Sequence, residues 1–111
     1  MVNKVLGFLG VVFLVIGVWG FVQNPILGYF EVDMVHNVVH LLTGLLALYF
    51  AGKSPEAAGN FALVFGVVYA LVAVLGFTMG SPVLGFLVVN GADNYLHAAF
   101  AVVFIIVGMM K

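Results

Sequence analysis

Four long apolar stretches restrict the folds open to this sequence more than any other feature. They cover about residues 5–22, 34–51, 61–79 and 95–110, and each is close to the roughly 17–25 residues that cross a bilayer core as a helix. Charged residues make up only 6% of the chain, against about 25% in an average soluble domain. We therefore expect an integral membrane protein and not a water-soluble one.

The four stretches should all be α-helices. Lipid offers no hydrogen-bond partners, so a spanning backbone must satisfy its own polar groups, and four spans cannot close a barrel. The predicted fold is all-α, a membrane four-helix bundle in a single domain over residues 1–111. The first stretch follows Lys4 as in a signal peptide, but its apolar run is long and lacks an A-x-A site, so we expect it to remain as a span.

The basic residues predict the orientation of the spans. Lys4, Lys53 and Lys111 fall at the two termini and in the middle loop, which an even number of spans places on one side of the membrane. Lysine-bearing loops favour the cytoplasm. We therefore expect a protein of the cell membrane with both termini in the cytoplasm.

The composition of the chain also limits the classes of molecule that it can bind. A net charge of -1 with three basic residues provides no basic surface for nucleic acid, and the absence of cysteine removes thiolate chemistry. The expected surroundings are the lipid bilayer and, because small residues recur on the spans, further copies of the chain or other membrane subunits.

The sequence contains an internal repeat. NPILGYFEVDMVHNVVH, from Asn24, aligns with SPVLGFLVVNGADNYLH, from Ser81, at a constant offset of 57 residues. This predicts a tandem repeat of a two-helix hairpin, with repeat one over residues 1–53 and repeat two over residues 54–111. Because each unit has two spans, the copies should share one orientation.

Each outer loop is predicted to form a short interfacial helix. Asn24 and Ser81 are good N-cap residues, and each precedes a proline, which is favoured at the first helical position. The apolar segments that follow, residues 25–32 and 82–89, are too short to span.

Polar side chains form a stripe on the second span and an equivalent stripe on the fourth. They are Asp33, His36, Asn37 and His40 on one, and Asn90, Asp93, Asn94 and His97 on the other. Spacings of i, i+3, i+4 and i+7 place each set on one helix face. Because polar groups in spans normally turn toward the bundle interior, we expect both stripes to line one polar pocket near the outer side.

The sharpest functional hypothesis is a metal site. His36 with His40, and Asp93 with His97, are i, i+4 pairs, and together they would offer four nitrogen and oxygen ligands suited to zinc, copper or iron. Haem between two of the histidines is disfavoured, because closely packed small-residue helices leave little room for a porphyrin.

Other uses of the stripes remain open. Asp33, Asn37 and Asn94 are candidates for binding a small ligand, while Asp33 and Asn90 are also well placed as N-caps, with Asp93 completing a capping box. The asparagines could instead bond across helix interfaces, which would suit a structural or accessory subunit. Proton or small-solute transport is a further alternative.

We expect no enzyme. No serine or cysteine nucleophile accompanies the histidines, and no glycine-rich phosphate loop follows a strand.

The segment HNVVHLLTGLLAL, residues 36–48, preceded by NPILGYFEVD, resembles a family of small bacterial four-span membrane proteins. The family's recurring feature is an HN-x-x-H segment opening the second span, with a weaker N-x-x-H element in the fourth. The resemblance implies the four-span fold and directs attention to the histidines and asparagines of both elements, but it implies no activity. The second copy departs from the pattern by having Asp93 where the first has His36.

Overall fold

The computed structural model describes residues 1–111 and is all-helical apart from loops and isolated bridges. Its helices are α1 (Val2–Val22), α2 (Met34–Ala51), α3 (Pro55–Met79) and α4 (Gly91–Gly108). All four are long and apolar enough to cross a membrane. The predicted all-α membrane bundle is confirmed.

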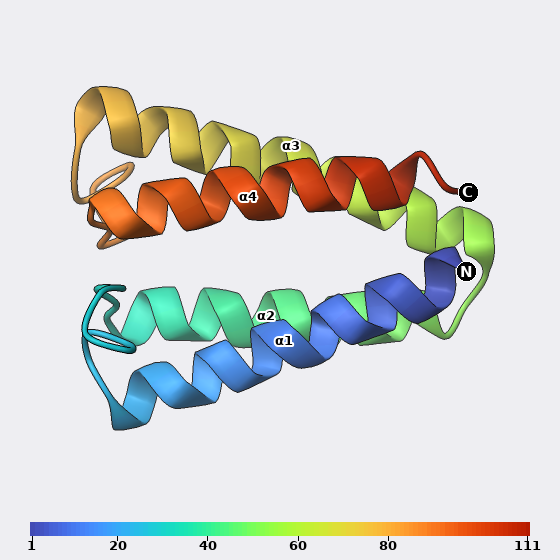
Figure 1. Ribbon diagram of the computed structural model, residues 1–111, viewed down its shortest axis with the longest axis horizontal. Coiled ribbons are helices and arrows are strands. Elements are labelled where there is room, and N and C mark those ends of the chain that lie inside the picture. Colours follow the sequence, from blue (N-terminus) through green and yellow to red (C-terminus); the bar gives the residue numbers. More distant parts are fainter.

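The helices form two antiparallel hairpins that lie beside each other (Figure 1). One hairpin is α1 with α2 and the other is α3 with α4. Both termini and the α2–α3 turn lie at one end of the bundle, and the loops at residues 23–33 and 80–90 lie at the other. The three lysines therefore belong to one end, as the sequence predicts.

Capping residues mark where α2, α3 and α4 begin. α2 has the predicted bounds, but α3 begins six residues earlier than the apolar stretch and α4 four residues earlier. The Ser54 side chain accepts a hydrogen bond from the Ala57 N–H at 3.0 Å, with Pro55 in the first turn. Hydropathy marks the part of a helix that suits lipid, whereas the cap marks where the helix starts.

The prediction of a short helix at residues 25–32 is wrong. This segment is a tight loop, in which Ile26 pairs with Phe30 in an antiparallel bridge. Leu27 and Gly28 have φ values of 55° and 78°, which lie outside the right-handed helical region. The Asn24 amide bonds both the N–H and the C=O of Val32, so it closes the loop and does not cap a helix.

The prediction of a short helix at residues 82–89 is also wrong, because this segment forms the same kind of tight loop. Val83 pairs with Leu87, and Leu84 and Gly85 have φ values of 53° and 83°. The Ser81 hydroxyl accepts a hydrogen bond from Val89 N–H at 3.1 Å. The two loops thus share one conformation at the offset of 57, while the origin of the chain as a tandem repeat stays a prediction.

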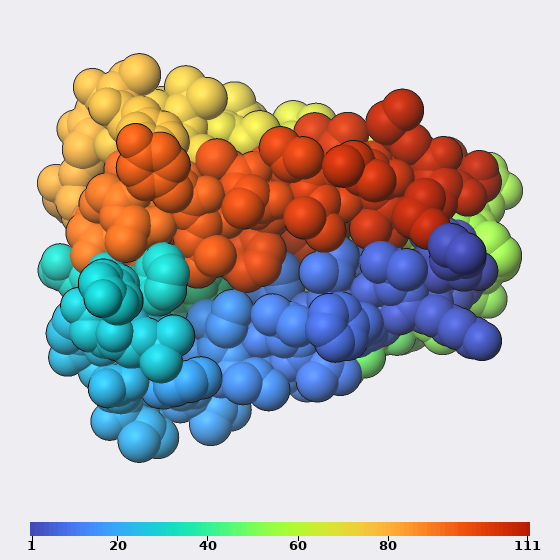
Figure 2. Space-filling model, viewed as in Figure 1, coloured from blue at the N-terminus to red at the C-terminus, as the bar shows by residue number.

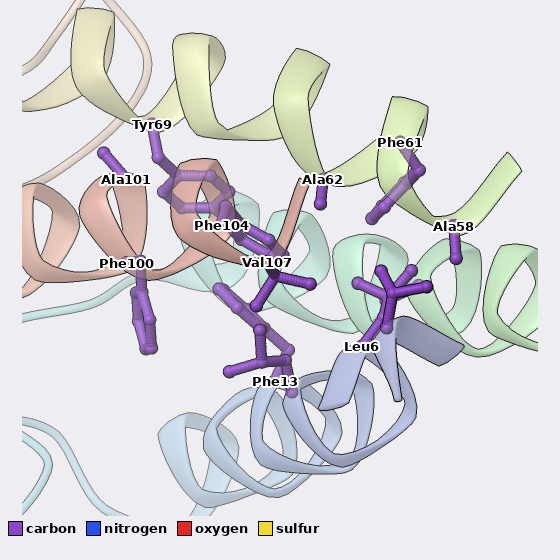
Figure 3. Packing of buried hydrophobic residues seen from close by; sticks show 13 residues of the cluster. Leu6, Phe13, Ala58, Phe61, Ala62, Tyr69, Phe100, Ala101, Phe104 and Val107 are labelled. Atoms are coloured by element: carbon purple, nitrogen blue, oxygen red, sulfur yellow. The ribbon is translucent and has the colours of Figure 1, made fainter. Parts of the chain in front are cut away.

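The hydrophobic core joins the two hairpins, and aromatic rings dominate it (Figure 3). Phe13 of α1 is fully buried among Tyr69, Phe100 and Phe104, with ring centroids 4.4–5.6 Å apart. The Phe13 ring also meets the His40 ring edge-on, at 5.7 Å. The aromatic core therefore contacts the histidine-bearing face of α2 directly, through His40.

Candidate metal centre

Three histidines meet inside the bundle, near the end that carries the two long loops. His36 and His40 come from α2 and His97 from α4, and one ring nitrogen from each lies within 4.8 Å of the others. Their exposed fractions are 0%, 2% and 1%. The expectation that the second and fourth spans turn their histidines toward each other is confirmed.

Helices α2 and α4 contact each other through their histidine side chains, without a close approach of their backbones. No Cα atom of α2 lies within 8 Å of one in α4, yet the Nε2 atoms of His36 and His97 are 3.3 Å apart. His36 and His40 are one helical turn apart, with ring centroids separated by 4.4 Å. The Asp33 side chain caps α2 by accepting from the His36 N–H at 2.9 Å, so it helps to set where the histidine-bearing turn begins.

One hydrogen bond decides the tautomer of His36. Its Nδ1 lies 2.6 Å from the carbonyl oxygen of Val88 in the second loop. A carbonyl can only accept, so Nδ1 carries the hydrogen. In a neutral ring the Nε2 of His36 then presents a lone pair toward His97.

Three ring nitrogens in this cluster have no hydrogen-bond partner. They are both nitrogens of His40 and the Nδ1 of His97. A buried polar atom left unpaired costs about 1–3 kcal/mol, so such atoms are uncommon unless something else satisfies them. The side chains alone do not complete this site.

The cluster borders a cavity of about 70 Å³ that all three histidines line. Tyr69 and Thr43 line it too, with their oxygens 3.0 Å apart. Because the Thr43 hydroxyl donates its one hydrogen to the Val39 carbonyl at 2.8 Å, Tyr69 must be the donor in the pair. The Tyr69 oxygen therefore keeps its capacity to accept a hydrogen bond beside the cavity.

The sequence predicts Asp93 as a fourth ligand beside the three histidines. In the structure, Asp93 lies outside the three-histidine group. Its carboxylate Oδ2 accepts from the Asn90 N–H at 3.0 Å, and the Asn90 Oδ1 accepts from the Asp93 N–H at 2.9 Å. This is the capping box that the sequence also predicts. The start of α4 thus engages one oxygen of the carboxylate.

The asparagines lie at the interfaces within each hairpin. A Cβ added at Gly20 would be 1.8 Å from the Asn37 Oδ1, and one added at Gly76 would be 1.9 Å from the Asn94 Oδ1. Each asparagine thus fills the space that a glycine leaves on the neighbouring helix. Asn37, Asn94 and Asp33 do not line the cavity beside the histidines.

Sequence reasoning missed two contributors to the site. Tyr69 aligns with Phe13 of the first hairpin at an offset of 56 residues, which applies to the first span of each hairpin. A hydroxyl at this position inside an apolar span is a signal that the sequence offers. The Val88 carbonyl left no signal, because a backbone group carries no residue identity.

Comparison with known proteins identifies a family and no individual relative. Residues 4–110 match a family model described as "Domain of unknown function (DUF4383)". No curated protein and no solved structure matches the chain.

Proposed function

We propose that this chain, which belongs to the DUF4383 family of domains of unknown function, binds one transition-metal ion through His36, His40 and His97. The observation that carries this proposal is the meeting of three buried imidazoles of which three ring nitrogens lack partners. We propose binding, and not catalysis, as the role of the site.

The donor set suits zinc, copper or iron. Imidazole nitrogen is a good ligand for all three. In a tetrahedral site with Zn–N distances of about 2.0–2.1 Å, two ligand nitrogens are about 3.3–3.4 Å apart, and the Nε2 atoms of His36 and His97 are separated by 3.3 Å. The hydrogen bond from His36 Nδ1 to Val88 is of the kind that orients metal-bound histidines.

Three protein ligands leave a fourth coordination position for water or a small molecule. The cavity beside the histidines offers space for it, and the Tyr69 oxygen is available there as a hydrogen-bond acceptor. These features favour an open site over one closed by protein alone.

Metal loading tests the proposal. The protein is purified in detergent without chelator, loaded with zinc, copper or iron(II), desalted and analysed by mass spectrometry for metal content. We expect about one ion per chain, and at least tenfold weaker binding after His36→Leu, His40→Leu or His97→Leu, since each removes a ligand. Thr78→Leu is the matched control, because Thr78 is exposed and bonds only its own helix.

The same experiment can contradict the proposal. A wild-type protein that stays metal-free after loading with all three metals would leave the histidines with a structural role. Loss of thermal stability in the three leucine variants, without any metal bound to the wild type, would then identify the three histidines as packing contacts.

We also propose that both termini lie in the cytoplasm, since the three lysines share one end of the bundle. The chain lacks cysteine, so Lys53→Cys introduces a single thiol. We expect a membrane-impermeant maleimide to label it only after cells are permeabilised. Tyr29→Cys, at an exposed site in a loop at the other end, should label in intact cells. The reverse pattern would overturn the orientation.

A further inference from the structure

The three-histidine site brings no negative charge to an ion. Histidine binds a metal as the neutral imidazole, and the group in which the nitrogens of His36, His40 and His97 meet contains no carboxylate and no thiolate. The complex of the ion with its three ligands therefore keeps the full charge of the ion.

The acidic residues at this end of the bundle do not offset that charge fully. The Asp33 Oδ1 accepts from the His36 N–H, and the Asp93 Oδ2 accepts from the Asn90 N–H. Each carboxylate thus faces the positive end of a helix dipole, which already compensates part of its charge. Glu31, in the first loop, is exposed to the surroundings of the protein.

The surroundings of the site are apolar. The three imidazoles are at most 2% exposed, and on the face shown in Figure 2 the side chains of α1 and α4 meet over the interior of the bundle. Besides the histidines, Thr43 and Tyr69, the neighbouring cavity is lined by Val39, Phe65, Val68, Val72 and Leu87. The cost of moving an ion from water into such a medium grows with the square of its charge, so a divalent ion costs about four times as much as a monovalent one.

We propose that the ion held by the three histidines is copper(I). This inference rests on the proposed metal site and specifies its ion. Of zinc, copper and iron, copper is the one that proteins bind as a monovalent ion. Zinc in proteins is almost always four-coordinate, whereas three nitrogens satisfy copper(I).

The geometry of the histidines agrees with a three-coordinate ion. Three nitrogens placed about 2.0 Å from an ion, in one plane with it, are about 3.5 Å from one another. The Nε2 atoms of His36 and His97 are 3.3 Å apart. Copper(II) prefers a square-planar or tetragonal set of ligands, which three histidines from two helices do not supply.

A competition between two ions tests the proposal. The full chain in detergent is incubated under nitrogen with equal amounts of zinc(II) and copper(I), the latter added as its acetonitrile complex, and is then desalted and analysed for both metals. We expect about one copper per chain and at least tenfold less zinc. His40→Leu should lose the copper, which places the ion at the histidines. Copper(II), offered alone, should be retained at least about tenfold less than copper(I).

A substitution in the second loop tests whether charge causes the preference. Leu87 lines the cavity and lies outside the four helices, so Leu87→Asp brings a negative charge beside the ion. We expect the ratio of bound zinc to bound copper to rise at least about tenfold. Leu87→Asn has nearly the same shape as Leu87→Asp without the charge and should keep the original preference. If Leu87→Asp does not fold, as judged by circular dichroism, Val72→Asp and Val72→Asn make the same comparison from α3.

The results separate this inference from the metal site itself. Zinc bound as well as copper(I) would overturn the inference and leave metal binding by the three histidines intact. Equal retention of copper(II) and copper(I), or equal effects of aspartate and asparagine in folded variants, would also overturn it. A chain that takes up neither zinc nor copper would contradict the proposed site and this inference together.

Discussion

Gly44→Ala is expected to destabilise the first hairpin by about 3 kcal/mol. The added Cβ would lie 2.8 Å from the carbonyl oxygen of Gly10 and 2.9 Å from the backbone nitrogen of Leu14. Both are backbone atoms, so the contact can be relieved only by moving α1 away from α2. Reversible unfolding by SDS in detergent micelles, followed by circular dichroism, measures the loss.

Gly7→Ala is the matched control for this substitution. A Cβ at Gly7 would be 3.8 Å from the Ala51 Cβ, which is an ordinary van der Waals distance. Its free energy of unfolding should stay within about 0.5 kcal/mol of the wild type. Equal destabilisation by the two substitutions would show that helix flexibility, and not close approach of the backbones, is what the glycines provide.

Phe13→Ala should be the most damaging substitution in the core, with an expected loss of about 3–5 kcal/mol. The ring is 0% exposed and lies among Tyr69, Phe100 and Phe104 of the second hairpin. Its removal leaves a cavity at the junction of the hairpins, and lipid cannot fill a cavity enclosed by protein. The same SDS unfolding assay measures the effect.

Phe8→Ala removes the same ring from α1 at a site that is 66% exposed. Because that ring faces away from the core, its loss opens no internal cavity, and we expect a cost below about 1 kcal/mol. A loss at Phe8 as large as the loss at Phe13 would contradict the assignment of Phe13 to the centre of the bundle.

The spans and caps could be predicted from the sequence because each depends on local chemistry. An apolar segment in lipid must form a helix, and the side chains of Asp33, Ser54 and Asn90 cap helices within three residues of their own positions. The loops could not be predicted by the same rules. The proline start signal is local, but the side chains of Asn24 and Ser81 bond eight residues away, where they close a loop.

The convergence of the histidines was predictable in part. Helical periodicity places His36 and His40 on one face, and the repeat places His97 on the matching face of the fourth span. Periodicity assigns a residue to a face, but it does not set how far two helices are rotated or shifted against each other. For that reason it could not separate Asp93, which caps α4, from the three histidines.

The sequence by itself determined that this protein is a membrane bundle of four helices with polar stripes turned inward, since water, lipid and hydrogen bonding act on every segment independently. Only the tertiary structure decided which polar atoms meet. The close approaches at Gly10 and Gly44, and the glycine spaces filled by Asn37 and Asn94, set how the helices pair. The packing of one hairpin against the other then brings His36 within reach of Val88 and leaves the nitrogens of His40 unpaired.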